Sequence, residues 1–371
     1  MHLKKRIRLI IAIVLLVQLL PCMDVHASDQ DYTIEDGKRV PIPETYVLEK
    51  VIWNIQPTGE ESPFLKEPED IFINEEGFVF VVDTGNNRII KLSSEGEFIN
   101  SRGPEDKPLN GPQGIYVDDK GNMYIADTGN ERILHLDFEG NYVEEFVKPD
   151  SELLGEDFIF APTKLYISPT GYIYCIKAQA ILTIDANNNF KGYLGQPEIG
   201  YSWVDALIRI FASEEQKRII RKRTAPSYIN IVMDKSGMIY ATSLDRREGE
   251  IKKLNSVGKN IYRKYSVSTS SRIFDFLFTT GLEDKSFVFG ERRNDQGASI
   301  NPVFKDLAVD ENGIVTALEE QTGKLYQYDQ NGNLLTVFGG KGDQKGYFNL
   351  PSSLAVNKEG KIYVLDKGNA N

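Results

Sequence analysis

Two stretches decide the fold, VDTGNNRI at residues 82–89 and ADTGNERI at residues 126–133. Each comes after a run of β-branched and aromatic residues, which is typical of a strand, and that run comes after a turn of the form Asx/Ser-x-x-Gly. In such a turn the short oxygen-bearing side chain accepts a backbone hydrogen bond, and the glycine tolerates a positive φ angle. The same turn occurs six times along the chain, at residues 74–77, 118–121, 168–171, 234–237, 310–313 and 357–360.

Each turn lies between two apolar segments. The residue before the turn is apolar in all six copies, and the near-continuous apolar run after it indicates that both faces of each strand are covered. A second turn follows nineteen residues after the first in three copies, at Gly96, Gly140 and Gly332. Each copy therefore has the pattern of a four-stranded antiparallel meander.

The spacing of the copies predicts how they are arranged. The glycines of successive turns are 44, 50, 66, 76 and 47 residues apart, close to the roughly 40–45 residues of a propeller blade once two insertions are removed. A single meander cannot cover its own two faces, so the units must pack around a common axis. We expect an all-β, six-bladed propeller over residues 45–371. Its blades are expected at about residues 64–103, 109–147, 158–195, 225–267, 301–340 and 347–371.

The two quoted stretches resemble NHL repeats. With its degenerate members the resemblance covers about residues 64–371, and it implies a six-bladed NHL-type β-propeller from a bacterial, exported protein. The middle units depart from the motif, because Lys177, Ser243 and Glu319 stand where the family has Asp six residues after the turn glycine. The residues expected to hold the repeat motif together are Asp83, Asn86, Arg88, Asp127, Asn130, Arg132 and Asp366.

Two insertions interrupt the repeat, at about residues 198–224 and 268–300. In the first, the apolar residues of the stretch 202–211 fall on one helical face, and Ser213 with Gln216 makes a capping box for a second helix. The sequence predicts a helical hairpin between blades three and four. The second insertion has no clear period.

The last unit is expected to be incomplete. It stops within the motif, at residues 366–371, and so lacks its third and fourth strands. Residues 46–55 are strand-like and are expected to supply one outer strand from the other end of the chain. One strand is still missing, so we expect an exposed edge that can pair with another chain. One interpretation is a truncated fragment of a longer, membrane-attached NHL protein.

The N-terminal segment has the pattern of a secretory signal. A basic region at residues 4–8 precedes an apolar run at residues 9–20, and Pro21 breaks the helix before Val25-His26-Ala27. We expect a signal peptide at residues 1–27, a linker at residues 28–44, and an exported, extracytoplasmic protein. An uncleaved membrane anchor is the alternative.

The amino-acid composition limits which partners and which catalytic or metal sites the chain can have. The chain has 43 Lys and Arg against 54 Asp and Glu, a net charge of −11, which disfavours nucleic acid as a partner. After the signal only His135 and Cys175 remain of the three histidines and two cysteines, which excludes a zinc site rich in His or Cys and a Cys-His nucleophile pair. We expect His135 to be exposed and idle, and Cys175 to be buried and inert. No catalytic residue, metal or cofactor is assigned.

Two candidate binding surfaces remain. One is a basic cluster on the second inserted helix, suited to anionic lipid headgroups or wall polymers. Its residues are Lys217, Arg218, Arg221, Lys222 and Arg223. The other is the mouth of the central channel, where propellers usually bind ligands. Its expected residues are Glu69, Gln113, Thr163 and Ser352.

These features favour a non-catalytic, extracytoplasmic binding or scaffold propeller that recognises a protein, peptide or glycan. A membrane surface or membrane domain is a second expected partner. The enzyme alternative is a metal-dependent hydrolase, which the similarity to six-bladed lactonases implies, although no aligned set of Glu, Asn and Asp ligands can be assigned. Fold alone does not decide between these functions, and the sequence does not indicate an oligomeric state.

Overall fold

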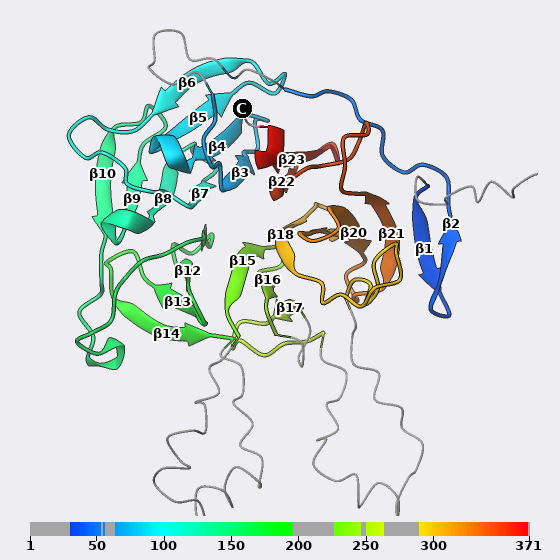
Figure 1. Cartoon of the computed structure of the whole chain (residues 1–371). Coiled ribbons are helices and arrows are strands. Elements are labelled where there is room, and N and C mark those ends of the chain that lie inside the picture. Colours follow the sequence, from blue (N-terminus) through cyan, green and yellow to red (C-terminus); the bar gives the residue numbers. More distant parts are fainter. Residues whose placement is uncertain are drawn as a thin grey trace, which may run out of the picture.

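The strands of this chain form separate antiparallel sheets that stand around a central axis (Figure 1). The computed structural model describes residues 30–52, 55, 64–195, 226–245, 250–262 and 289–369. The predicted signal segment and the predicted helical hairpin lie outside these ranges. Within them, no helix is long and apolar enough to cross a bilayer. The helices found there are short 3-10 turns, η2 (Thr84–Asn86), η3 (Thr128–Asn130), η4 (Glu152–Leu154) and η5 (Lys367–Asn369).

Three blades have four strands each. Blade one contains β3 (Asp70–Ile73), β4 (Val79–Asp83), β5 (Arg88–Leu92) and β6 (Phe98–Arg102). Blade two contains β7 (Gly114–Val117), β8 (Met123–Asp127), β9 (Arg132–Leu136) and β10 (Tyr142–Phe146). Blade three contains β11 (Leu165–Ile167), β12 (Ile173–Lys177), β13 (Ala180–Ile184) and β14 (Phe190–Leu194).

The remaining units differ in strand number. Blade four has three described strands, β15 (Tyr228–Met233), β16 (Ile239–Ser243) and β17 (Ile251–Leu254). Blade five contains β18 (Phe304–Val309), β19 (Val315–Glu319), β20 (Lys324–Tyr328) and β21 (Leu334–Gly339). The sixth unit is a two-stranded sheet of β22 (Pro351–Val356) and β23 (Ile362–Asp366).

Among the described residues the structure therefore has five blades, not the six expected. The sixth unit, expected to be incomplete, supplies two strands among the described residues. Its inner strand nevertheless closes the ring. The innermost strands contact one another in the cyclic order β3, β7, β11, β15, β18 and β22, and β22 contacts β3.

Apolar packing between neighbouring sheets explains this arrangement. Each of the six hydrophobic clusters joins two adjacent units. Between blades one and two, for example, Phe80 and Ile89 pack with Ile115 and Leu134. No sheet covers both of its own faces, so each is shielded by the next one around the axis.

The N-terminal segment adds a hairpin to blade five. Strands β1 (Tyr32–Glu35) and β2 (Lys38–Pro41) lie within the range expected as a linker, and β1 pairs with β21 at Val337. Glu291 fixes the hairpin: it accepts hydrogen bonds from the Tyr32 hydroxyl and from Arg39 Nε, the latter at 2.6 Å. The hairpin thus covers the outer edge of blade five, which protects that edge from pairing with other chains.

The strand expected at residues 46–55 is not formed in residues 46–52, which have no strand hydrogen bonds. This segment is extended but crosses the outside of the sixth unit without joining a sheet. The absence of strand pairing in residues 46–52 has a simple cause. The third strand that would bring an outer strand into hydrogen-bonding range is absent from the described part of this unit.

The motif residues hold the loops of blades one and two. The buried carboxylate of Asp83 accepts hydrogen bonds from the backbone N–H of Lys66 (2.6 Å), from Asn86 Nδ2 (2.8 Å) and from Arg88 Nε (2.7 Å). Thr84 Oγ1 donates to the carbonyl of Pro112 in the next blade. The Asp-Thr-Gly-Asn loop therefore forms hydrogen bonds both within its own blade and to the neighbouring blade.

Blade two repeats this arrangement. Asp127 accepts from the Asn110 N–H, from Asn130 Nδ2 and from Arg132 Nε, each at 2.8 Å. The glycine between them is required by close approach, because a Cβ on Gly129 would lie 2.5 Å from the Asn110 carbonyl oxygen.

The middle units replace the motif with other polar groups. In blade five, Glu319 accepts from the N–H groups of Val303 (3.1 Å) and Thr322 (2.7 Å). In blade four, Asp245 pairs with Lys252 at 2.8 Å, and both side chains are buried. The missing Asp of the family motif is thus compensated by other carboxylates at the same ends of these two blades.

Replacement of Asp127 should destabilise the fold strongly. Asp127→Ala removes the buried acceptor of the Asn110 N–H, of Asn130 and of Arg132, although Arg132 keeps its ion pair with Glu145. The free energy of unfolding should fall by about 2–3 kcal/mol. Urea unfolding followed by tryptophan and tyrosine fluorescence measures the loss. The matched control is Asp119→Ala on an exposed turn, where we expect a change within about 0.5 kcal/mol. Equal losses in both variants would contradict the role given to Asp127.

Candidate functional site

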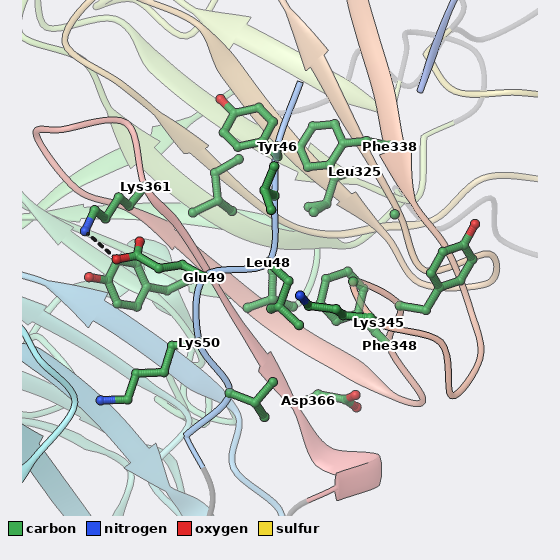
Figure 2. Close-up of a pocket in the computed structure, with 18 of the residues that line it drawn as sticks. Tyr46, Leu48, Glu49, Lys50, Leu325, Phe338, Lys345, Phe348, Lys361 and Asp366 are labelled. Carbon is green, nitrogen blue, oxygen red and sulfur yellow. Dashed lines mark hydrogen bonds and ion pairs between the residues drawn. The ribbon is translucent and has the colours of Figure 1, made fainter. Parts of the chain in front are cut away.

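A large groove lies beside β23, where the described residues of the sixth unit form two strands (Figure 2). Its volume is about 1270 Å³. One wall is β23 with the neighbouring residues of blade one, and another is the outer part of blade five. The extended segment 46–52 crosses its open side. The groove is therefore bounded by three separate parts of the chain.

Segment 46–52 is anchored through Tyr46, Glu49 and Lys50. The Tyr46 ring stacks on Phe338 of blade five with ring centroids 4.6 Å apart (Figure 2). Glu49 Oε1 lies 3.1 Å from Lys361 Nζ in the sixth unit, and Lys50 Nζ donates to the Glu95 carbonyl of blade one. Between these contacts, Leu48 lines the groove.

The floor of the groove is apolar. On the blade-five side it is formed by Leu325, Phe338 and Phe348, which belong to one hydrophobic cluster together with Ile362 and Val364. On the blade-one side, Val79, Val81 and Leu92 pack with Leu365 and Tyr363 in a second cluster. Two inter-unit cores thus border the groove here, and Val79, Val81, Leu92 and Leu325 are each exposed by 2% or less.

The edge of β23 faces this floor. The carbonyl of Lys361 accepts from the Asn357 N–H, and the Lys367 N–H donates to the Leu350 carbonyl, so the odd-numbered residues of β23 face β22. Backbone groups alternate in direction along a strand. The N–H and C=O groups of Ile362 and Val364 therefore point away from β22, toward the groove, and among the described residues β23 pairs with β22 alone.

A second candidate site lies at the centre of the ring. One residue in each unit stands seven positions before the turn glycine, on the innermost strand or at its start. These residues are Asp70, Gly114, Lys164, Asn230, Asp306 and Ser353. Apart from Gly114 and Ser353 they line a small channel cavity of about 170 Å³.

The polar members of this ring bind one another. Asp306 accepts hydrogen bonds from Asn230 Nδ2, from Ser353 Oγ and from the Leu354 N–H, the last at 2.8 Å. Ser353 Oγ also lies 3.1 Å from Asp70 Oδ1, and the Lys164 ammonium pairs with the same carboxylate. The ring therefore ties units one, three, four, five and six together.

Burial raises the pKa of Asp306 to about 6. The charge of Lys164 acts in the opposite direction, and the nearby Asp70 carboxylate adds to the increase. The described residues contain no group of three or more His, Cys, Asp or Glu side chains placed to hold a metal ion. At the ring, the Lys164 ammonium already neutralises one of the two carboxylates, so a divalent cation would have to displace it.

The four residues expected at the channel mouth stand one position before this ring. None of them is among the residues that line the channel cavity. Glu69 pairs with Lys367 of the sixth unit, and buried Ser352 donates to the Pro68 carbonyl. Gln113 and Thr163 bond through their backbone N–H groups to the next strand of their own blades. Because a strand alternates its faces, a shift of one residue exchanges channel-facing and loop-facing positions.

The ring residues were missed although the sequence contains the signal. Position seven before the glycine is Asp, Gly, Lys, Asn, Asp and Ser in the six units. A polar residue recurring at one position of an otherwise apolar inner strand indicates a shared polar layer. The groove, in contrast, had no signal beyond the short last unit.

Other sequence expectations have mixed outcomes. The basic cluster at residues 217–223 lies outside the described residues.

The expectation that His135 is exposed is wrong: the ring is buried, stacks on Tyr124 with centroids 4.1 Å apart, and lies 3.0 Å from Glu144 Oε1. Cys175 is buried as expected, and burial raises the pKa of its thiol to about 12. That thiol is therefore a poor nucleophile.

Comparison with known protein families identifies the repeat. A family model described as the NHL repeat matches residues 109–136, which cover β7, β8 and β9 of blade two with the Asp-Thr-Gly-Asn loop. The protein is an NHL-repeat β-propeller. The resemblance seen in the sequence is confirmed. No curated protein sequence matches the chain significantly.

Several solved structures are similar to this propeller in fold. Streptogramin B lyase is 13% identical with a TM-score of 0.48, and the match covers 92% of this chain and 85% of that chain. Virginiamycin B lyase from Staphylococcus aureus is 11% identical with a TM-score of 0.47, covering 81% and 77%. Hydrazine synthase of Kuenenia stuttgartiensis is 11% identical with a TM-score of 0.49, covering 85% and 77%.

The pKa of Asp306 gives the NHL-repeat propeller a characteristic pH dependence. Between the ordinary value of 3.8 and about 6, the folded protein holds a proton that the unfolded chain has released. Asp306 therefore destabilises the fold progressively as pH rises through this window, by up to about 3 kcal/mol. The variant Asp306→Asn removes this dependence.

Urea unfolding of the wild type and Asp306→Asn at pH 4 to 7 checks this expectation. The free energy of unfolding of the variant, relative to the wild type, should increase with pH by up to about 3 kcal/mol. Any constant loss from the changed hydrogen bonds does not alter this slope. Asp119→Asn, on an exposed turn, should show no slope. A flat difference for Asp306→Asn would refute the raised pKa.

Proposed function

We propose that this NHL-repeat propeller is a non-catalytic binding module that takes up an extended peptide segment of another protein in the groove of the sixth unit. The observation that carries the proposal is the groove itself, with its apolar floor and its strand edge. The apolar N-terminal run and the basic region before it support a location outside the cytoplasm.

The shape and chemistry of the groove favour a peptide over a small substrate. Ligand pockets for small molecules usually enclose most of the ligand and converge a few polar groups on it. This groove is long and open, and its polar side chains are spread along the rim, as with Glu49, Lys345 and Lys361. Apolar pockets beside an open strand edge are the features with which proteins recognise extended peptides.

The metal-dependent hydrolase gains no support from a particular arrangement of residues. Asp70 and Asp306 of the channel ring are the carboxylates that most resemble metal ligands. Asp70 already pairs with Lys164, and Asp306 already accepts a hydrogen bond from Asn230. Their hydrogen bonds join neighbouring units, which is a structural role.

Selection of peptides against the purified protein tests the proposed function. A display library of random twelve-residue peptides should yield binders, and the variant Leu48→Arg should weaken their binding at least about tenfold, because it places a charge in the apolar groove. The matched control is Leu153→Arg. Leu153 is 79% exposed and does not line the groove, so its variant should bind as the wild type does.

Two results would contradict the proposal. One is the absence of any selected peptide. The other is equal binding to Leu48→Arg and to the wild type, which would place the peptide elsewhere on the propeller. Circular dichroism and thermal unfolding of both variants confirm that each retains the fold.

A further inference from the structure

We propose that the channel cavity binds a small organic cation, such as a quaternary ammonium group, which enters at the end of the channel where the six Asx/Ser-x-x-Gly turns lie. This site is separate from the groove, so the inference goes beyond the proposed function. Three features of the described residues select the same ligand. They are an aromatic wall, an excess carboxylate at the inner end of the cavity and an acidic rim.

The cavity is closed at the polar ring and accessible at the turns. Asp70, Asn230 and Asp306 of the polar ring are buried, and hydrogen bonds of the ring join neighbouring units at this level. The next residues on the same strand face stand five positions before the turn glycine, two positions nearer the turns. They are Phe72, Tyr116, Tyr166, Val232, Ala308 and Ala355, and all six line the cavity. Five of the six are partly exposed, and Ala355 alone is buried, so solvent reaches the cavity from the turn end.

The layer formed by these six residues is asymmetric. Units one to three contribute three aromatic rings, whereas units four to six contribute one valine and two alanines. The ring centroids of Phe72 and Tyr116 lie 5.5 Å apart, and those of Tyr116 and Tyr166 lie 4.7 Å apart, so the rings form a continuous wall. The small side chains on the other side leave a cavity of about 170 Å³. An apolar cavity of about 150 Å³ holds a benzene molecule, so a small organic group fits this one.

The inner end of the cavity has one negative charge in excess. Lys164 is the single cation of the polar ring, and it pairs with Asp70. Asp306 accepts hydrogen bonds from neutral partners, the side chains of Asn230 and Ser353 and two backbone N–H groups. Its carboxyl is ionised above a pKa of about 6. A buried charge of this kind is costly unless a cation lies nearby.

The hydrogen bonds of Asp306 favour a quaternary ammonium group over a metal ion. Both carboxylate oxygens of Asp306 already accept hydrogen bonds, and a metal ion would have to compete with these donors. A quaternary ammonium group has no hydrogen-bond donor and needs no free acceptor. It is attracted through space by the carboxylate and by aromatic rings, which is how proteins recognise such ligands.

The turns around the accessible end are acidic. The six turns together contain eight Asp and Glu against three Lys. Asp118 and Asp119 lie close to the aromatic wall: burial and the neighbouring Tyr166 raise the pKa of Tyr116, and these two carboxylates add to the increase. Negative charge at the entrance to a cavity concentrates cations there. The rim therefore favours the same class of ligand as the interior.

Choline and its neutral analogue dimethylbutanol are a matched pair of probes. A carbon atom replaces the charged nitrogen in dimethylbutanol, so the two molecules have the same shape and differ in charge. Isothermal titration of the full-length chain at about pH 8 should show that choline binds at least about tenfold more tightly than dimethylbutanol. The same protein is used in both titrations, so a folding defect cannot produce this difference.

Two protein variants locate the bound cation. Ala308→Leu fills part of the cavity without changing a charge, and it should weaken choline binding at least about tenfold. The matched control is Ala186→Leu, because Ala186 is exposed and does not line the cavity; its variant should bind choline as the wild type does. Asp306→Asn removes the excess charge at nearly constant size. It should also weaken choline binding about tenfold, with little effect on dimethylbutanol.

Three results would overturn the inference. They are the absence of choline binding, equal binding of choline and dimethylbutanol, and choline binding that neither Ala308→Leu nor Asp306→Asn weakens. The last result would place choline on the acidic surface outside the channel. Circular dichroism checks the fold of each variant, and if Ala308→Leu does not fold, Asp306→Asn and the pair of probes still decide. Leu48→Arg should not change choline binding, so failure of this inference leaves the proposed peptide groove standing.

Discussion

Every sheet of this propeller is apolar on both faces, and the rest of the structure follows from that constraint. Six hydrophobic clusters lie between six neighbouring pairs of units, so each sheet is shielded by two others. Closure requires that the last unit also pack against the first, and β22 and β23 do so through Leu365. A ring closed in this way has no exposed sheet face. The two-stranded sixth unit is sufficient for this because its inner strand completes the circle.

Apolar packing alone does not fix how the sheets are placed around the axis, since it has no directional preference. The polar ring at the channel supplies the direction. Asp306 accepts hydrogen bonds from units four and six, and Asp70 forms an ion pair with Lys164 of unit three. Such a buried network is stable only when its members are satisfied together. The Asp-Thr-Gly-Asn loops act at the ends of blades one and two, where Thr84 and Thr128 bind the following blades.

The periodic parts of the chain were predictable from sequence, and the irregular parts were not. The turn glycines and the strands around them identify the repeat because a left-handed backbone position and a two-sided apolar strand each restrict residue choice. The polar ring at Asp70 and its equivalents was not recognised, because periodicity marks a strand but not which of its faces turns inward. The expectation that Glu69, Gln113, Thr163 and Ser352 bind a ligand at the channel mouth stays a prediction. His135 was expected at the surface because a single polar residue gives no information about the Tyr124 ring that covers it. The hairpin of β1 and β2 depends on Glu291, more than 250 residues away, and local sequence cannot reveal such a contact.

The groove and the closed ring both depend on which strands of a unit contact the neighbouring units. Inner strands and second strands carry the contacts that close the circle, as the sequence of neighbours from β3 to β22 shows. Outer strands add apolar residues to the cores between units, as Leu134 and Phe338 do, and cover the edge of their own sheet. The described residues of the sixth unit form two strands, and its inner strand still closes the ring, while the edge of β23 faces the groove. Segment 46–52 bridges this opening without filling it, since its contacts are made by side chains at Tyr46, Glu49 and Lys50 and not by strand pairing.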